Sequence, residues 1–244
     1  NAKNERSLKL RFHTQTAGFS LTAQQPENNI TRTSIQALAA VLGGTQSLHT
    51  NSMDETLALP SEKAAEIALR TQQLIAYETG MANVADPLGG SWLIESLTDQ
   101  LEQEAEEYFE EIERLGGVIQ GIEKGYFQRE IARSARSYQK LVDEKNLFII
   151  GVNQFDKDDE NIDIPILEIG PETEQIQVKA LNELKSTRNE TTVQQALHKI
   201  QETCSNGGNI MPPIIEASKV YVTLGEIVTA MKAEFGEWQE AAVF

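Results

Sequence analysis

The pattern of apolar and polar positions between residues 8 and 55 predicts a strand, a helix and a second strand. The strands are expected over residues 8–16 and 45–51. Between them lies an apolar stripe at helical spacing, made of Ile35, Leu38, Ala39, Val41 and Leu42. Residues that favour helix ends flank this stripe, namely Thr31 and Thr33 as candidate caps before it and Gly43 and Gly44 as stops after it. A strand, a crossover helix and a strand predict a right-handed parallel βαβ unit.

Alternate side chains along a strand point to opposite faces, so parity assigns each residue to a face. One face is expected to be polar and to hold Arg11, His13, Gln15, Thr45, Ser47, His49 and Asn51. The other face is expected to be apolar and to hold Leu8, Leu10, Phe12 and Leu48. Strands of an ordinary parallel sheet are apolar on both faces, and an ordinary (β/α)8 barrel fills its interior with branched apolar side chains. The pattern therefore favours a barrel that holds a ligand along its axis, with a satisfied polar core or a solvated face as the alternative.

Three long segments carry a resemblance to a known family. They are residues 11–33 (RFHTQTAGFSLTAQQPENNITRT), 38–60 (LAAVLGGTQSLHTNSMDETLALP) and 86–95 (DPLGGSWLIE). These segments resemble the catalytic large subunit of the adenosylcobalamin-dependent methylmalonyl-CoA mutase family. The resemblance extends with short gaps over residues 8–153 and resumes weakly to the end. Isobutyryl-CoA, 2-hydroxyisobutyryl-CoA and ethylmalonyl-CoA mutases share the segments, so the substrate stays open among them.

The resemblance implies an α/β fold, the C-terminal part of a (β/α)8 TIM barrel with about three βα units followed by a mainly helical extension. The partial barrel is expected over residues 3–153 and the helical linker over 154–244, with residues 1–2 as a cloning remnant. The N-terminal half of the barrel and a cobalamin-binding domain are then expected as partners outside this chain. The DxHxxG motif, whose histidine ligates cobalt in such domains, does not occur here.

Further elements follow from periodicity, caps and turn residues. Strand-like runs are expected at residues 84–87, as the last barrel strand, and at 147–152; residues 155–163 are expected to be an exposed linker. Helices are expected at residues 61–79, 98–115, 118–124, 126–145, 172–187, 191–204, 210–221 and 223–235. The helix at 126–145 should face the core through Ile131, Ala135, Tyr138 and Leu141.

The resemblance also implies a function and a site. The complete enzyme would isomerise the carbon skeleton of (R)-methylmalonyl-CoA and succinyl-CoA by radical chemistry, with an acyl-CoA substrate and adenosylcobalamin as cofactor. Gln15, Asn51 and Glu55 would contact the cofactor, because amide and carboxylate groups suit ribose hydroxyls. By parity, His13 and His49 face the same cavity, with no assigned role. The substrate-contacting tyrosine, arginine and histidine of the family belong to the part that precedes this chain.

Other interpretations of these residues stay open. Asp54 and Glu55 could simply favour the N-terminus of the following helix through its dipole. His13, His49, Asp54 and Glu55 could instead bind zinc or iron, although no HxH or HExxH spacing supports a metal site. A piece of a barrel also has exposed strand edges, so the chain could be a structural subunit that is inactive alone.

Composition narrows the remaining classes. The 244 residues are 40% hydrophobic and 24% charged, as in a globular protein, and the net charge of −16 argues against a nucleic-acid partner. No apolar run spans a membrane and no signal peptide is evident. The single cysteine, Cys204, cannot form an internal disulfide, which favours a cytoplasmic location. An incomplete barrel is expected to self-associate, and His198, on an amphipathic helix, is expected to be structural.

Overall fold

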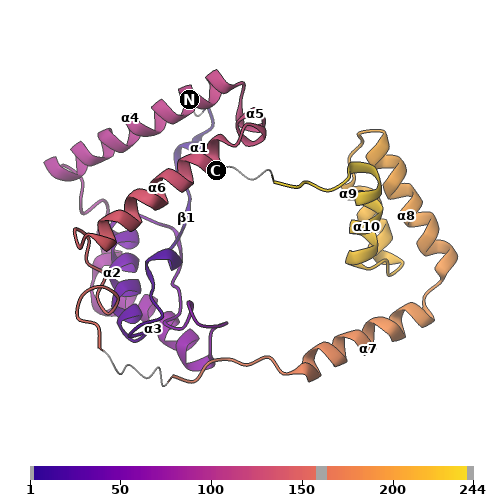
Figure 1. The fold of residues 1–244 in the computed structure, drawn as a ribbon, viewed down its shortest axis with the longest axis horizontal. Helices are drawn as coiled ribbons and strands as arrows, with labels where there is room; N and C mark the ends of the chain where they lie inside the picture. Colours follow the sequence, from indigo (N-terminus) through magenta and orange to yellow (C-terminus); the bar gives the residue numbers. More distant parts are fainter. Residues whose placement is uncertain (1–2, 158–163, 241–244) are drawn as a thin grey trace. The chain divides into compact units, whose positions relative to one another are not determined.

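The computed structural model describes residues 3–157 and 164–240 (Figure 1). The chain divides into two compact units, with the division between Glu168 and Ile169. The described part of the first unit contains a small parallel sheet and several helices, and that of the second unit contains helices only. The predicted domain boundary after residue 153 stays a prediction.

The first unit is mostly helical, with two short strands in its described residues. This composition is compatible with part of an α/β barrel plus added helices. In chain order its elements are α1 (Glu5–Leu8), β1 (His13–Gln15), η1 (Gly18–Ser20), α2 (Asn28–Leu42), β2 (Ser47–His49), α3 (Glu62–Glu78), η2 (Met81–Asn83), α4 (Trp92–Leu115), α5 (Val118–Glu123) and α6 (Tyr126–Asp143), where η denotes a 3-10 helix.

The predicted parallel βαβ arrangement is confirmed. β1 and β2 pair in parallel, with His13 opposite Ser47 and Gln15 opposite His49, and α2 connects them. As predicted, α2 ends at the glycine pair, because Gly43 is its C-cap and Gly44 has a φ of +80°. The sheet therefore brings the C-terminal ends of both strands to the same edge.

Both strands are shorter than their patterns predict. The predicted start of the first strand at Leu8 is wrong, because residues 5–8 form α1, which the Asn4 side chain caps by accepting from the N–H of Arg6. Leu10 then has a φ of +36°, which interrupts an extended backbone. The second strand ends at His49. The hydroxyl of the next residue, Thr50, donates to the Ala68 carbonyl of α3.

The predicted caps of α2 are also wrong. The helix begins earlier, at Asn28 with Glu27 as N-cap, so Thr31 and Thr33 lie within it. Thr33 is buried and its hydroxyl donates to the Asn51 carbonyl at 3.4 Å. The Thr33 hydroxyl therefore takes part in tertiary packing. The sequence alone does not tell a threonine that caps a helix from one that packs inside it.

Helix α3 follows its prediction closely. Ser61 is the N-cap and accepts from the N–H of Ala64 at 3.3 Å, and Gly80 follows the helix with a φ of +72°. Ala64, Ala68, Thr71 and Ile75 of α3 are buried, whereas Leu74 is exposed. Figure 1 shows α2 and α3 side by side next to β1. These two helices cover one face of the sheet.

Two predicted strand-like runs are wrong. Residues 84–87 form bends and a turn after η2, with Asp86 at a φ of +46°, so the sheet of the described residues has two strands rather than three. Residues 147–152 contain one isolated bridge, from Ile150 to Gln154. There the Asn153 amide donates to the carbonyls of Val142 and Leu147 and closes a turn.

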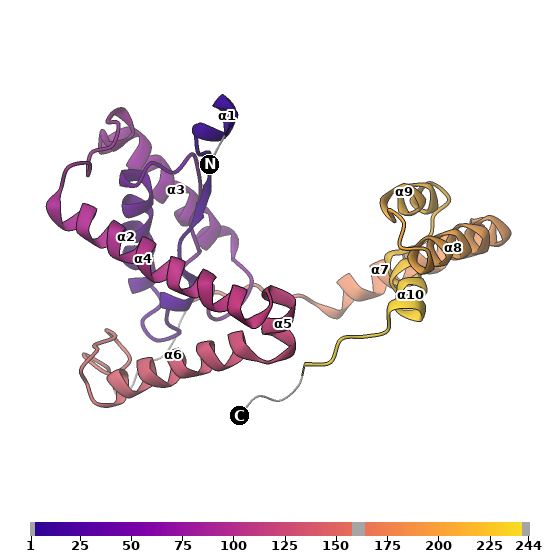
Figure 2. The same cartoon turned by 90° about the horizontal axis from the view of Figure 1, so that it is seen from above.

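Helices α4 and α6 are joined by α5 and converge towards it (Figure 2). Gly116, with a φ of +101°, ends α4 as predicted. Neither helix contains a buried residue; Leu101 of α4 is 65% exposed and Ile131 of α6 is 69% exposed. The expectation that Ile131 faces the core is therefore wrong. Tyr138 does pack, with its ring 5.3 Å from that of Phe19.

The second unit holds the predicted C-terminal helices, with ends shifted by a residue or two. They are α7 (Pro171–Thr187), α8 (Glu190–Ser205), α9 (Met211–Lys219) and α10 (Leu224–Phe235). Its core consists of Val193, Ile200, Cys204, Ala217, Val222 and Ile227. His198 is exposed near Glu202. Most of the predicted linker, residues 158–163, lies outside the described residues. Within the described ranges, no helix is both long and apolar enough to cross a membrane.

Candidate functional site

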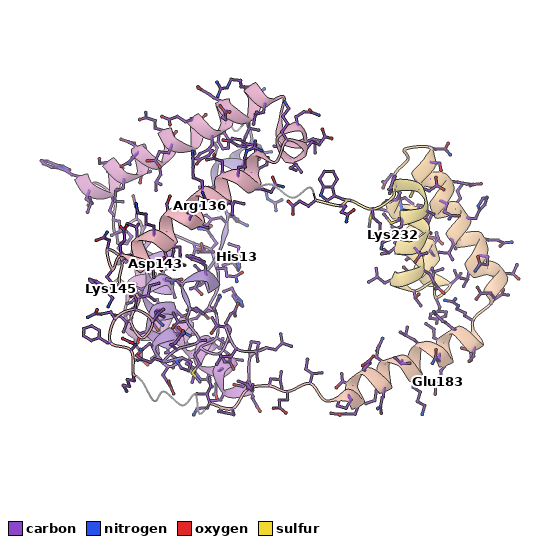
Figure 3. The ribbon with its side chains drawn as sticks, viewed as in Figure 1. His13, Arg136, Asp143, Lys145, Glu183 and Lys232 are labelled. Atoms are coloured by element: carbon purple, nitrogen blue, oxygen red, sulfur yellow. The ribbon has the colours of Figure 1, made fainter. Side chains whose placement is uncertain are left out.

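The two strands present a polar face that is exposed on this chain. His13, Gln15, Ser47 and His49 are exposed, whereas the alternate residues Thr14 and Leu48 are partly buried on the helix side. His13 Nδ1 and Ser47 Oγ lie 2.8 Å apart. Figure 3 shows the His13 side chain projecting away from α2 and α3. The parity prediction is confirmed for these strand residues; Leu10 and Phe12 precede the strand and are exposed.

Asn51 is fixed at the point where both strands end. It is 2% exposed, and its Oδ1 accepts from Thr16 Oγ1 at 3.0 Å and, at a long 3.5 Å, from Gln15 Nε2. Its backbone N–H donates to Thr16 Oγ1 at 2.9 Å. The carbonyl oxygen of Asn51 accepts from Thr33 of α2. Four hydrogen bonds, made by the side chains of Gln15, Thr16 and Thr33, therefore determine where Asn51 lies.

Gly18 brings the remaining predicted residue into the same cluster. A Cβ built on Gly18 would lie 3.0 Å from Asn51 Nδ2 and 3.4 Å from Glu55 Oε1. The structure therefore brings Asn51 and Glu55 together at Gly18, while Gln15 reaches Asn51 through the long contact to its Oδ1. Within the described residues, Asn51 Nδ2 is buried and has no hydrogen-bond partner. A buried donor without a partner is costly, so the position of this amide needs an explanation.

A buried asparagine joins the two loops that carry this cluster. Asn29, at the start of α2, is fully buried and its Nδ2 donates to Thr22 O at 2.8 Å and Met53 O at 2.9 Å. Its Oδ1 accepts from the Thr22 N–H at 3.1 Å. Thr22 lies in the loop after β1 and Met53 in the loop after β2. The sequence prediction assigned no role to Asn29, because no local pattern relates it to Met53.

Asp54 and its neighbour Glu55 play different parts. Asp54 is fully buried, and its Oδ2 accepts from the backbone N–H of Ser61 at 2.9 Å. Burial raises the pKa of Asp54, but hydrogen bonds from the Ser61 backbone and from the Ser52 and Ser61 side chains outweigh it, so the pKa is lowered. Asp54 thus stabilises the loop before α3, while Glu55 is exposed beside Gly18. The alternative in which these carboxylates favour the N-terminus of α3 through its dipole stays a prediction.

The metal alternative gains no support from the geometry. In the residues that the structure describes, no three histidine, cysteine, aspartate or glutamate side chains are placed to hold a metal ion. His13 is paired with Ser47, and Asp54 is paired with Ser61. The chemistry present at the ends of the strands is that of amide and carboxylate hydrogen bonding.

Comparison with known proteins gives a consistent result. The chain matches the family model described as methylmalonyl-CoA mutase over residues 1–237. It is 43% identical over 244 residues to the 2-hydroxyisobutanoyl-CoA mutase large subunit of Aquincola tertiaricarbonis, with 100% of this chain and 43% of that protein covered. It is 42% identical over 234 residues to the methylmalonyl-CoA mutase of Rhizobium meliloti (strain 1021), with 95% of this chain and 33% of that protein covered.

A third relative is the mitochondrial methylmalonyl-CoA mutase of Homo sapiens, which is 42% identical over 237 residues, with 96% of this chain and 32% of that protein covered. The chain therefore spans between about a third and less than half of the length of the curated relatives that it matches.

Proposed function

The chain belongs to the methylmalonyl-CoA mutase family, and on this basis we propose that it forms part of the catalytic subunit of an acyl-CoA mutase. The complete enzyme interconverts (R)-methylmalonyl-CoA and succinyl-CoA by moving a group between adjacent carbons of the thioester. The observation that carries the proposal is the buried, unpartnered Asn51 Nδ2 beside the Glu55 carboxylate, at the common end of two parallel strands. In barrel enzymes this end of the strands carries the chemistry.

The residues around Gly18 fit adenosylcobalamin as the cofactor. Enzymes of this family use cobalamin, and its adenosylated form supplies the radical chemistry of the rearrangement when it is bound. Ribose hydroxyls both donate and accept hydrogen bonds. Asn51 Nδ2 offers a donor and Glu55 an acceptor, and the Gln15 amide offers both. These three side chains would bind and orient the sugar, and the unpartnered Asn51 donor would gain its missing partner.

The exposed polar face of the sheet supports a cavity wall. Parallel sheets are normally covered on both faces, yet His13, Gln15, Ser47 and His49 are exposed on this chain. In the complete enzyme we assign this face to the interior of a (β/α)8 barrel that the preceding part of the protein closes. Polar side chains there would line the space for an acyl-CoA substrate and help to exclude bulk water. His13 and His49 face this space without an assigned role.

The partners follow from the length of the relatives. The preceding half of the barrel and a cobalamin-binding domain or subunit would complete the enzyme, and the chain alone is expected to be inactive. An oligomeric enzyme and a cytoplasmic location remain predictions from the sequence.

A second substrate has specific support. The 43% identity to a 2-hydroxyisobutanoyl-CoA mutase large subunit extends over the whole chain, and is as high as the identity to methylmalonyl-CoA mutases. The alternative function is therefore isomerisation of 2-hydroxyisobutyryl-CoA or a related branched acyl-CoA. The test uses an enzyme reconstituted from this chain, the preceding half of the barrel and the cobalamin-binding domain or subunit. Its turnover with each thioester separates these substrates, and activity with neither would contradict the proposal.

The site assignment is tested by Asn51→Ala and Glu55→Gln in the reconstituted enzyme. Each lost hydrogen bond should cost about 1 kcal/mol, which weakens adenosylcobalamin binding about fivefold. Binding of the CoA ester should change little. Turnover should fall further than cofactor binding, because the reaction depends on how the bound groups are oriented.

Glu62→Gln is the matched control, because Glu62 is an exposed carboxylate in the first turn of α3, close in sequence to Glu55. If Glu55 only favours the helix dipole, both variants should lower the melting temperature without cofactor and leave cofactor binding unchanged. If Glu55 binds the cofactor, only Glu55→Gln should weaken adenosylcobalamin binding. Wild-type binding and turnover in both Asn51→Ala and Glu55→Gln would remove the assignment.

A further inference from the structure

Arg32 lies on α2, and its guanidinium joins three segments of the first unit. Its Nη1 donates to Thr22 Oγ1 at 2.9 Å and to Asn29 Oδ1 at 2.8 Å, and its Nη2 donates to the Ile150 carbonyl at 2.8 Å. These acceptors belong to the loop after β1, the beginning of α2 and the turn that follows α6. A planar guanidinium holds oxygens on different sides in fixed directions, and its charge strengthens each hydrogen bond. Arg32 is therefore suited to keep these segments in one arrangement.

The contact with Arg32 completes the hydrogen bonds of the buried Asn29 amide. An asparagine side chain has two donor and two acceptor positions. Asn29 Nδ2 donates to the carbonyls of Thr22 and Met53. Asn29 Oδ1 accepts from the Thr22 N–H and from Arg32 Nη1. If the amide turned over, its NH2 group would face the guanidinium, so Arg32 helps to fix the orientation in which Asn29 holds the loop after β2.

The turn after α6, residues 149–155, is held from within. The Asn153 side chain accepts one N–H of the turn and donates to two carbonyls, one at the end of α6 and one just before the turn. Gly151 has a φ of +80°, a conformation that favours glycine. The turn can therefore present the Ile150 carbonyl to Arg32 from a defined position.

The same turn also meets the loop after β1 directly. Gln25 Nε2 donates to the Phe155 carbonyl at 3.1 Å. A Cβ built on Gly151 would lie 2.9 Å from Gln25 Cδ, closer than normal packing. A side chain at position 151 would therefore displace the turn or Gln25.

We infer that Arg32 is a positioning residue, which uses the turn after α6 as an anchor and aligns the loops after β1 and β2 through Asn29. The inference rests on the proposed function, because the loop after β2 carries Asn51 and Glu55. Met53, where Asn29 holds this loop, lies two residues from each of them. Arg32 touches no ligand in this role. Its effect on cofactor binding passes through the backbone of the loop.

Arg32→Met in the reconstituted apoenzyme tests the alignment without any cofactor. Methionine keeps an apolar stem but removes every donor. The N–H groups of Leu57 and Ala58 donate to the Asp54 carbonyl within the loop after β2. Their hydrogen–deuterium exchange, measured on peptides of this loop by mass spectrometry, should become about tenfold faster. The melting temperature should fall only slightly, because Asn29 keeps three of its four hydrogen bonds.

Cofactor binding gives a second readout on the same variant. Adenosylcobalamin binding to Arg32→Met should weaken about tenfold, while the KM for the acyl-CoA substrate should stay within about twofold. Arg32→Lys keeps the charge but has no planar fork, so it should recover only part of the binding. Arg70→Met is the matched control, because Arg70 is an exposed arginine of α3 that pairs with Glu66. It should leave loop exchange and cofactor binding unchanged.

The turn after α6 is tested as the anchor by Gly151→Ala. This variant should weaken adenosylcobalamin binding, since it strains the turn and presses on Gln25. If the turn acts through Arg32, adding Gly151→Ala to Arg32→Met should cost much less binding than Gly151→Ala costs alone. Gly44→Ala is the control, because Gly44 also has a φ of +80° but has no atom within 4 Å of a built Cβ. It should leave cofactor binding unchanged.

The outcomes separate the inference from the proposed function. A wild-type enzyme without adenosylcobalamin-dependent turnover would overturn the proposed function, while exchange in the apoenzyme would still decide the alignment. Unchanged exchange of Leu57 and Ala58 in Arg32→Met would overturn the inference alone. Full recovery by Arg32→Lys, or additive binding costs of Gly151→Ala and Arg32→Met, would do the same. So would a fall in the melting temperature of Arg32→Met that is large enough to account for its binding loss.

Discussion

Replacing Glu226 by glutamine should destabilise the packing of the helices of the second unit. Arg188, at the C-terminal end of α7, has a side chain that is 3% exposed, and it donates from Nη2 and Nη1 to the two carboxylate oxygens of Glu226 at 2.6 and 2.7 Å. Arg188 Nη1 also donates to the Tyr221 carbonyl at 2.9 Å. The Glu226 carboxylate further accepts from the N–H and the hydroxyl of Thr223, both at 2.9 Å. One ion pair thus joins the end of α7, the loop before α10 and the first turn of α10.

The structure gives the size of the effect. Hydrogen bonds from Arg188 lower the pKa of Glu226 from 4.5 to about 2, against the opposing effect of burial and with help from Thr223. A difference of this size corresponds to about 3 kcal/mol of stability at neutral pH. The cost of leaving one charge of a largely buried pair without its partner is of the same order, about 3–5 kcal/mol, and describes the same loss rather than an additional one. Glu226→Gln should therefore raise the opening equilibrium of these helices about a hundredfold at pH 7.

The pH dependence has a definite sign. The folded pKa of Glu226 lies below its unfolded value, so the stabilisation is complete above pH 4.5 and is lost as the pH falls from 4.5 towards 2. Wild-type protein should lose about 3 kcal/mol of local stability over this range, whereas Glu226→Gln should lack this contribution. Hydrogen–deuterium exchange of peptides from α8 and α10, corrected for intrinsic rates at each pH, measures both quantities.

Glu216→Gln is the control in the same unit. Glu216 is 69% exposed and pairs with Lys219 at i,i+3 on α9. An exposed pair of this kind contributes about 0–1 kcal/mol, so exchange of α8 and α10 should hardly change. The reasoning is refuted if Glu226→Gln exchanges like wild type at pH 7, or if both proteins lose protection equally between pH 4.5 and pH 2.

Two further predictions concern the loops around the candidate site. Asn29→Ala should destabilise the first unit by about 2–4 kcal/mol in urea unfolding, because it leaves the buried groups of Thr22 and Met53 without partners; Asn28→Ala, at the less buried neighbouring position, should cost much less. The lowered pKa of Asp54 means that its ionised form stabilises the fold, and this stability is lost as the pH falls below 3.8. Asp54→Asn should lack this contribution at every pH. Amide exchange at Leu57 and Ala58 across this pH range measures it, and an unchanged acid dependence in Asp54→Asn would contradict the assignment.

Sequence periodicity and cap residues were sufficient wherever one segment decides its own structure. Local patterns predicted the helix between the strands and its stop at Gly43, the helix at 61–79, the end of α4 at residue 115 and the helices of the second unit. Strand parity also placed His13 and His49 on one face correctly, because alternation is a property of the strand itself. Gln15, Asn51 and Glu55 were grouped as one predicted site by the family resemblance, because no local sequence pattern relates them.

What only the tertiary structure decided were the features that depend on partners distant in sequence. A strand is defined by its pairing. Residues 84–87 have the sequence pattern of a strand but pair with no other strand among the described residues, and Leu8 lies in helix α1 rather than in a strand. Asn29 and Met53 are 24 residues apart, and Arg188 and Glu226 are 38 apart. Asp54 and Glu55 are adjacent and chemically similar, yet one is buried and the other exposed. The two residues differ in burial and in hydrogen bonding across loops, and the local spacing of residues predicts neither property.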